Sequence, residues 1–181
     1  MCIRDSLKGE DELVGMVQVD PDDKDDIVLI TQTGMALRFK LDTVSCTGRA
    51  TAGVRGIDVA KNDAVRWFEI PKAGTMLFVV SDRGFGKRML CDDIERQGRA
   101  GKGQKLLPMN KSGETGQMLA ACLNVTEAKA VRVEQKHGHV TTLDVSEISV
   151  QRRTAKGELL VNVLLDDVVA VSYTHLTLPT I

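Results

Sequence analysis

Short apolar runs separated by glycine-containing turns are the dominant pattern of this sequence. Residues 27–31 (IVLIT) form one run, and residues 35–40 (MALRFK) then alternate between apolar and polar side chains. Alternation with a period of two is typical of a half-buried β-strand, because successive side chains point to opposite faces of a sheet. Residues 54–59 and 64–70 predict two further strands. Four short strands are therefore expected between residues 27 and 70.

The same order of strands and turns returns twice along the chain. Three sets of landmark residues keep offsets of 50 and 54 residues between copies: Gly34, Gly84 and Gly138; Arg49, Arg99 and Arg153; Gly53, Gly103 and Gly157. A repeat of this length with short strands is typical of a propeller-type blade, and at most one helical turn is expected, at residues 92–97. We therefore predict an all-β, propeller-like fold with about three four-stranded blades.

This repeat also divides the chain into units. The predicted blades cover residues 27–73, 74–127 and 128–171. Residues 7–26 are interpreted as the closing strand of a preceding blade followed by an acidic linker. The aspartate run in this linker lacks the glycine and glutamate spacing of an EF-hand, which argues against a metal-binding loop. The two ends, residues 1–6 (MCIRDS) and 172–181 (SYTHLTLPTI), break the repeat and resemble translated sequencing-adaptor read-through. We expect both ends to be non-native tails.

Charge changes this picture locally. The chain as a whole is balanced, with a formal net charge of −1, whereas residues 83–105 carry seven basic and three acidic side chains. Five glycines interrupt that basic stretch, so its backbone can turn tightly and approach a ligand closely. A basic, glycine-rich segment of this kind favours contacts with phosphate groups.

Several other chemistries are disfavoured by the residues present. The four cysteines are far apart and form no CxxC motif, which argues against zinc and disulfides and fits reduced thiols in the cytoplasm. No apolar run approaches the ~20 residues of a membrane span. Residues 98–105 (GRAGKGQK) resemble a P-loop, but Gln104 stands where that motif requires lysine. We expect no cofactor, no metal site and no catalytic triad in this chain.

The phrases TGMALRF, TAGVRGIDV, DRGFGKRM, GRAGKGQ and VSEISVQRRTAKG resemble the C-terminal domain of the DNA gyrase A subunit, with the related subunit of topoisomerase IV as the near alternative. The resemblance implies a six-bladed β-pinwheel that binds and bends duplex DNA, of which these units would be the last three blades. Residues 97–103 (QGRAGKG) and 151–157 (QRRTAKG) each match five of the seven positions of the family's heptapeptide Gln-Arg-Arg-Gly-Gly-Lys-Gly.

That resemblance also implies what surrounds the chain. The partners would be duplex DNA, the remainder of the A subunit, and the ATPase B subunit, in the cytoplasm and nucleoid of a bacterium. ATP and Mg²⁺ would be used elsewhere in that complex, which is a type IIA topoisomerase that introduces negative supercoils. The chain itself would not be an enzyme, because the single tyrosine that could act as the strand-cleaving nucleophile, Tyr173, lies in the expected tail.

The candidate DNA-binding residues are the lysines and arginines that recur in and around the loops of each unit. They are Arg38, Lys40, Arg49 and Arg55 in the first unit, Lys87, Arg88, Arg99, Lys102 and Lys105 in the second, and Arg152, Arg153 and Lys156 in the third. Side-by-side blades would align these loops in one curved basic track. The alternative is a propeller-type scaffold for protein partners whose basic loops are incidental. Binding to phosphates weakens steeply with salt, so salt dependence separates the two hypotheses.

Overall fold

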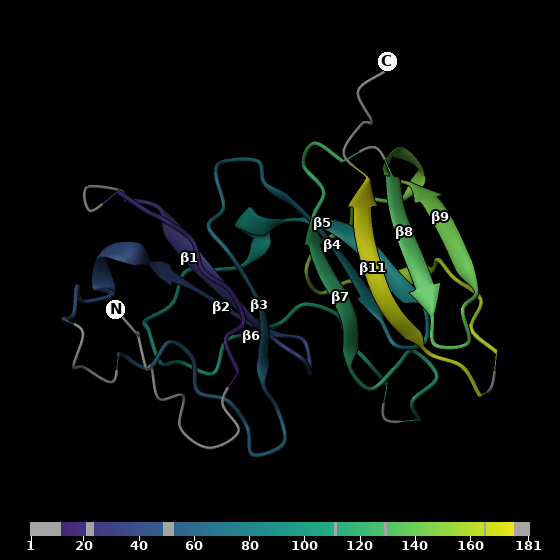
Figure 1. The fold of residues 1–181 in the computed structure, drawn as a ribbon, viewed down its shortest axis with the longest axis horizontal. Helices are drawn as coiled ribbons and strands as arrows, with labels where there is room; N and C mark the ends of the chain where they lie inside the picture. The colour runs from purple at the N-terminus through teal and green to yellow at the C-terminus, as the bar shows by residue number, and fades with distance from the viewer. Residues whose placement is uncertain are drawn as a thin grey trace, which may run out of the picture.

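The computed structural model describes residues 12–20, 24–48, 53–110, 112–128, 130–164 and 166–175. It contains three antiparallel β-sheets placed one after another along the chain (Figure 1). The described helical segments are three single 3₁₀ turns: η1 (Leu41–Thr43), η2 (Cys91–Asp93) and η3 (Val145–Glu147). This confirms the predicted all-β fold, and the helical turn expected at residues 92–97 begins one residue earlier and is shorter.

Each sheet is built on one β-hairpin. Sheet A has the order β3-β1-β2-β6, with β1 (Asp26–Thr31), β2 (Met35–Lys40), β3 (Val65–Glu69) and β6 (Gln104–Lys105). Sheet B has the order β10-β5-β4-β7, with β4 (Met76–Ser81), β5 (Phe85–Leu90), β7 (Leu119–Asn124) and β10 (Glu158–Leu159). Sheet C has the order β11-β8-β9, with β8 (Ala130–Gln135), β9 (Val140–Asp144) and β11 (Val169–His175).

The repeated glycines form equivalent hairpin turns, as predicted. Gly34, Gly84 and Gly138 have φ of 84°, 80° and 84°, a left-handed conformation that glycine adopts without strain. The N–H of each glycine donates to the carbonyl three residues earlier, at 2.8–3.0 Å. A three-residue loop that ends in a left-handed glycine is a common hairpin connection, so the sequence repeat is also a structural repeat.

The fourth strand of sheets A and B comes from the following unit, which differs from our expectation. Strand β6 pairs with Met35 and Ala36 of β2, and strand β10 pairs with Phe85 and Gly86 of β5. Residues 54–59 form no strand, and the strands expected at 105–109 and 159–165 are reduced to β6 and β10. The predicted blades are therefore interleaved, because each of these two short strands leaves its own unit to extend the sheet before it.

Sheet C has three strands among the described residues, so the outer edge of β9 carries no described strand partner. Strand β11 runs to His175, so residues 172–175 of the expected tail pair with β8. At the other end, residues 12–20 form no strand, although a strand was expected within residues 7–19, of which 7–11 lie outside the described residues. Among the helices that the structure describes, none is long and apolar enough to cross a membrane.

Strand β4 lies at the centre of the molecule and is buried on both faces. Leu77 and Val79 pack in one apolar cluster with Val28 of sheet A, and Phe78 packs in a second cluster with Val131 of sheet C. Strands β7 and β11 lie side by side where sheets B and C meet (Figure 1). The three sheets therefore share two continuous cores, which fix the relative positions of the loops that the next section describes.

Candidate nucleic-acid interface

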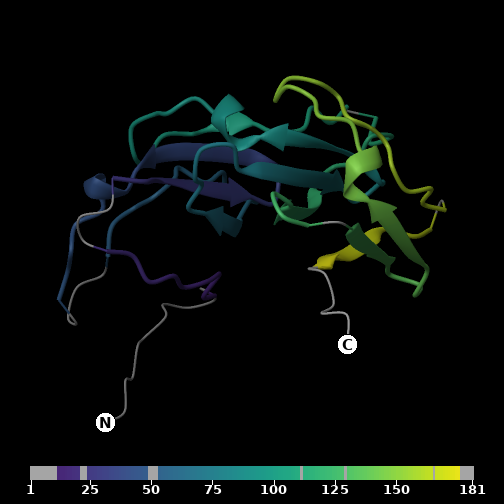
Figure 2. The ribbon, with the colours of Figure 1, turned by 90° about the horizontal axis from the view of Figure 1, so that it is seen from above.

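Two loops of equivalent sequence lie on the sheets that precede them. The first basic loop (residues 97–103) starts where Gln97 N–H donates to Arg38 O, and the second basic loop (residues 151–157) starts where Gln151 N–H donates to Arg88 O, both at 2.8 Å. Figure 2 shows the first loop in teal and the second in yellow-green along the same side of the molecule. The structure thus brings both heptapeptide-like segments to one side.

Glycine is needed at the end of each loop. Gly103 and Gly157 both have φ of 77°. A Cβ atom at Gly103 would lie 2.5 Å from the carbonyl oxygen of Ala36, and one at Gly157 would lie 2.7 Å from the carbonyl oxygen of Gly86. Real Cβ atoms do not approach backbone that closely, so both loops turn onto the preceding sheet at a point where only glycine fits.

An arginine in each loop fastens it to the unit before. Arg99 Nη1 donates to Arg55 O at 2.7 Å, and Arg153 Nη1 donates to Lys105 O at 3.1 Å. Arg55 and Lys105 are themselves related by the 50-residue offset. The Nε atoms of Arg99 and Arg153 are both buried without a hydrogen-bond partner. Each basic loop is therefore hydrogen-bonded to the backbone of a basic residue of the preceding unit, Arg55 for the first loop and Lys105 for the second. We call each loop together with that residue a cluster.

The remaining cations of these clusters reach solvent. Arg99 and Arg153 are half-buried, whereas the predicted residues Lys40, Arg55, Lys102, Lys105, Arg152 and Lys156 are exposed. Arg55 pairs with Asp58, and both side chains stay accessible. Arg49, the remaining predicted residue of the first unit, lies outside the described residues. Among the predicted DNA-binding residues, these six exposed lysines and arginines are the ones whose charges the structure places at the surface.

Three predicted residues instead point their charges into the protein. Arg38 Nε donates to Asp26 Oδ2 at 2.7 Å, and its Nη1 donates to Asp92 Oδ1 at 2.9 Å. Arg88 Nε donates to Ile148 O at 2.7 Å, so its guanidinium caps the carbonyl end of η3. Lys87 is fully buried. The expectation that these groups present free charges to a phosphate is corrected: each one stabilises a contact between successive units.

The ion pair around Asp26 was missed by the sequence reasoning, which treated residues 20–26 as a solvated linker. Asp26 opens strand β1 with a side chain only 4% exposed, and it also accepts from Arg96 Nη2 at 2.9 Å. Burial by itself would raise the pKa of the Asp26 carboxyl, but hydrogen bonds from Arg96 and Arg38 outweigh it and hold that pKa below its usual value. No local pattern signals this partner, since Arg96 is 70 residues away.

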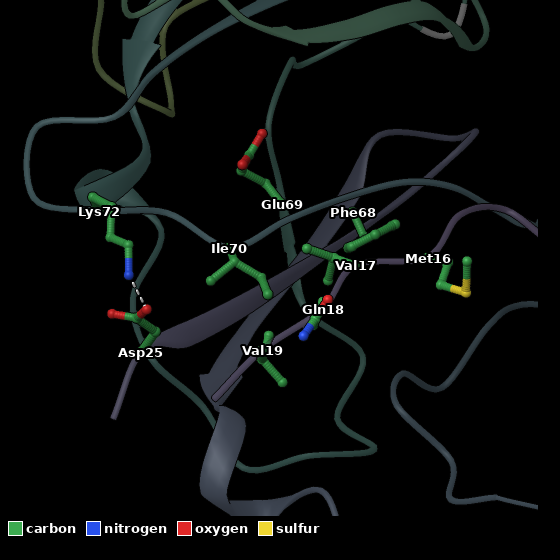
Figure 3. A pocket seen from close by; sticks show the side chains of 9 residues that line it. All are labelled: Met16, Val17, Gln18, Val19, Asp25, Phe68, Glu69, Ile70 and Lys72. Carbon is green, nitrogen blue, oxygen red and sulfur yellow. Dashed lines mark hydrogen bonds and ion pairs between the residues drawn. The ribbon is translucent and has the colours of Figure 1, made fainter. Parts of the chain in front are cut away.

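A hollow in the surface lies away from these loops. Met16, Val17 and Val19 line it together with Phe68 and Ile70, and its volume is about 430 Å³ (Figure 3). Its charged lining consists of Glu69 and an Asp25–Lys72 ion pair, so it lacks the excess positive charge of the basic loops. Over the described ranges, no group of three or more histidine, cysteine, aspartate or glutamate side chains could hold a metal ion.

Comparison with known proteins decides which family these features represent. A family model described as DNA gyrase C-terminal domain, beta-propeller, matches residues 25–72, 75–115 and 142–171. This chain belongs to that family. The DNA gyrase A subunit of Aminobacterium colombiense is 33% identical over 160 residues, which cover 88% of this chain and 19% of the relative. The DNA gyrase A subunit of Deinococcus deserti is 34% identical over 163 residues, which cover 87% of this chain and 20% of the relative.

Solved structures support the fold of this gyrase-family chain. The C-terminal domain of DNA topoisomerase IV aligns with a TM-score of 0.72 at 20% identity, covering 83% of this chain and 46% of that one. The DNA gyrase A C-terminal domain aligns with a TM-score of 0.71 at 21% identity, covering 84% of this chain and 51% of that one. The chain spans about a fifth of the length of the gyrase A subunits that it matches. The predicted resemblance and the predicted β-pinwheel are confirmed.

Proposed function

We propose that this chain binds and bends duplex DNA along the side that carries the two basic loops, as a non-catalytic part of a gyrase A subunit. The observation that carries the proposal is the repeated cluster: Arg99 with Arg55, and Arg153 with Lys105. Both clusters use the same donor atom, the same kind of acceptor and equivalent positions in successive units. A repeated cation cluster matches a ligand that is itself a repeating array of charge.

Duplex DNA is such a ligand. Its phosphates are regularly spaced, and proteins bind them without sequence preference through lysine and arginine contacts that release counterions. Clusters on successive sheets contact successive stretches of backbone, and a curved series of contacts favours bent DNA. Bending a short site strongly costs about 1–6 kcal/mol, which several added phosphate contacts offset. The exposed members Lys102, Lys105, Arg152 and Lys156 supply such contacts here.

The wider role follows from the relatives named above as gyrase A subunits. We assign to this chain the presentation of a bent DNA segment to a type IIA topoisomerase in the bacterial cytoplasm. Its partners there are the remainder of the A subunit, together with the ATPase B subunit. ATP, Mg²⁺ and the strand-cleaving chemistry then belong to other parts of that complex. Bending with a fixed handedness would support negative supercoiling by the whole enzyme.

A salt series tests the DNA contact. Affinity for a fluorescent duplex would be measured between about 50 and 200 mM salt, a range over which phosphate binding changes steeply. A variant with Lys102, Lys105, Arg152 and Lys156 changed to glutamine should lower the slope of log K against log salt by about 3 to 4 units, since each phosphate contact contributes about 0.9. Its control changes four exposed cations outside the clusters to glutamine: Lys24, Lys61, Arg132 and Lys136.

The two variants lose the same formal charge, so net charge alone predicts the same loss of affinity for both. A flattened slope in the cluster variant and a nearly normal slope in the control support the proposal. Equal slopes in the two variants would contradict the assignment of the interface to the basic loops. Affinity that does not change with salt would favour the protein-scaffold alternative, because apolar interfaces do not release counterions.

A further inference from the structure

Lys87 is a fully buried lysine that forms no ion pair with a described carboxylate within 4 Å. It lies in strand β5, and its Nζ atom donates to three backbone carbonyl oxygens: Arg152 O at 2.9 Å, Arg153 O at 2.7 Å and Ala155 O at 2.7 Å. Lysine side chains are almost never buried completely, and an ammonium group has three donors. All three N–H donors of Lys87 therefore donate to carbonyl oxygens of the second basic loop.

The equivalent position in the first unit is occupied differently. Leu37 precedes Lys87 by the 50-residue offset and is also fully buried, and its Cδ1 atom lies in van der Waals range of a Cβ placed on Gly101 in the first basic loop. An apolar side chain thus supports one loop, and an ammonium group supports the other. The two loops follow the same path on different supports.

Among the described residues, the first basic loop has no lysine ammonium to hold it, and it is attached instead by backbone hydrogen bonds that the second loop does not share. Ala100 N–H donates to Gly56 O at 2.7 Å, and Gly101 O accepts from Asp58 N–H at 2.9 Å. In the described structure, residues 152–155 are tied to other segments by Lys87 and by Arg153 Nη1 on Lys105 O. Lys87 therefore provides most of the polar attachment of the second loop.

We propose that Lys87 is the positioning residue of the second basic loop: its buried ammonium gathers the carbonyls of residues 152, 153 and 155 and so holds Arg152, Arg153 and Lys156 in the arrangement that contacts DNA. This inference rests on the proposed DNA-binding function. Lys87 touches no ligand itself. It turns the backbone oxygens of the loop inward, and the basic side chains of the loop are left on the outside.

Protonation of Lys87 controls this attachment. Burial, and then the positive charge of Arg153, lower the pKa of Lys87 to about 8, while Asp93 of η2 acts in the opposite direction. A neutral amine has two donors for three carbonyls, so one of the three bonds is lost when Lys87 releases its proton. The second basic loop therefore loosens as the pH rises through about 8, and the first basic loop, which lies on Leu37, does not.

Hydrogen exchange tests the attachment without DNA. Protection factors of the amides in residues 152–157 would be measured for the whole chain from pH 6.5 to 9.5, with residues 97–103 as the internal reference. Lys87→Met keeps an unbranched side chain, one atom shorter than that of lysine, and removes the ammonium, and Leu37→Met is the matched control. In Lys87→Met we expect protection of the second loop to fall about tenfold at pH 7, as for the loss of a hydrogen bond to a charged group.

DNA affinity over the same pH range tests the consequence. The unmodified chain should lose about threefold to tenfold in affinity above pH 8, whereas Lys87→Met should be weaker at pH 7 by a similar factor and nearly flat with pH. A residue that served stability alone would lower affinity without flattening the profile. Leu37→Met should keep the pH profile of the unmodified chain.

Each contrary outcome has a separate meaning. Unchanged protection of residues 152–157 in Lys87→Met overturns the inference. Lost protection with normal affinity overturns it too, and if Arg152→Gln with Lys156→Gln then weakens binding, the proposed DNA-binding function still stands. If that double variant also binds normally, the function proposed for this loop fails together with the inference. Should Lys87→Met fail to fold, a pH-independent loop in the unmodified chain overturns the inference by itself.

Discussion

Arg153 Nη1 lies 3.1 Å from the carbonyl oxygen of Lys105, and this bond joins two units that the sequence repeat would separate. The same guanidinium keeps a buried Nε atom without a hydrogen-bond partner. One Nη1 donor of Arg153 is thus structural and Nε is buried, so a phosphate contact from this half-buried side chain would use its other Nη donors. Arg99 repeats the relationship with Arg55. Arginine suits this double role because its fork of five donors is planar and rigid.

The first prediction concerns the geometry of that fork. Arg153→Ala should lower the slope of log K against log salt by about 1 unit, the loss expected for one phosphate contact. It should also lower the free energy of unfolding by about 0.5–1.5 kcal/mol through the lost bond to Lys105. Arg153→Lys keeps the charge and should retain most of the slope but not the stability. If Arg153→Lys left both the salt slope and the free energy of unfolding unchanged, the planar guanidinium would have no special role at this position.

A second prediction concerns Asp26 at low pH. Its pKa is depressed in the folded chain, so the stability that it contributes is complete above the pKa of about 3.9 of an unfolded aspartate and is lost as the pH falls through the folded value. Asp26→Asn should lower the free energy of unfolding at pH 7 by about 2 kcal/mol, because Arg38 and Arg96 lose a buried partner. The difference from the unmodified chain should shrink towards pH 2.

Urea unfolding at pH 7, 4 and 2 measures this difference directly. Asp42, which is exposed in η1, provides the control, and Asp42→Asn should change the free energy of unfolding by no more than about 0.5 kcal/mol at any pH. A constant difference between Asp26→Asn and the unmodified chain from pH 7 to pH 2 would contradict the assigned role of the carboxylate.

The third prediction concerns the glycine that ends the second basic loop. Gly157→Ala places a Cβ atom 2.7 Å from Gly86 O at a φ of 77°, and should lower the free energy of unfolding by about 1–3 kcal/mol. Gly98→Ala meets no atom within 4 Å and should have an effect below about 0.5 kcal/mol. Fluorescence of Trp67, the single tryptophan, reports the transition. Equal effects of the two substitutions would show that the close approach is not required.

A fourth prediction concerns thiol reactivity. Burial raises the pKa of Cys91 to about 12 and raises the pKa of Cys122 as well, so neither thiol forms a thiolate near neutral pH. Cys46 is exposed. Alkylation at pH 8, followed by peptide mass spectrometry, should label Cys46 readily and should label Cys91 and Cys122 only after unfolding. Rapid labelling of Cys91 in the folded chain would contradict its place in the core.

The sequence predicts the hairpins well because their signals are local. Alternation in residues 35–40 and the glycine at position 34 both depend on neighbours a few residues away. Strand β4 carries an apolar run rather than an alternating one, and the structure explains it: Leu77 faces one core and Phe78 faces the other. The repeat therefore predicts the fold class and the number of sheets.

What the sequence does not predict depends on distant partners. Strand β6 has two residues, too few for any periodicity, and its pairing with Met35 comes from a different unit. Lys87 stands at the strand position that Leu37 holds in the first unit, and a lysine there indicates solvent until a loop from the next unit covers it. In each case the missing information is a contact with a distant part of the chain.

Interleaved sheets also set an order for synthesis on the ribosome. Strand β3 ends at Glu69, but sheet A stays incomplete until Gln104 and Lys105 have been translated. Sheet B likewise stays incomplete until Glu158 and Leu159 have been translated. A nascent chain therefore exposes the edge of β2, and later the edge of β5, while the next unit emerges, and an exposed strand edge can pair with other chains. Slow translation between these points would prolong that exposure, so codon usage in the second and third units bears on the yield of folded protein.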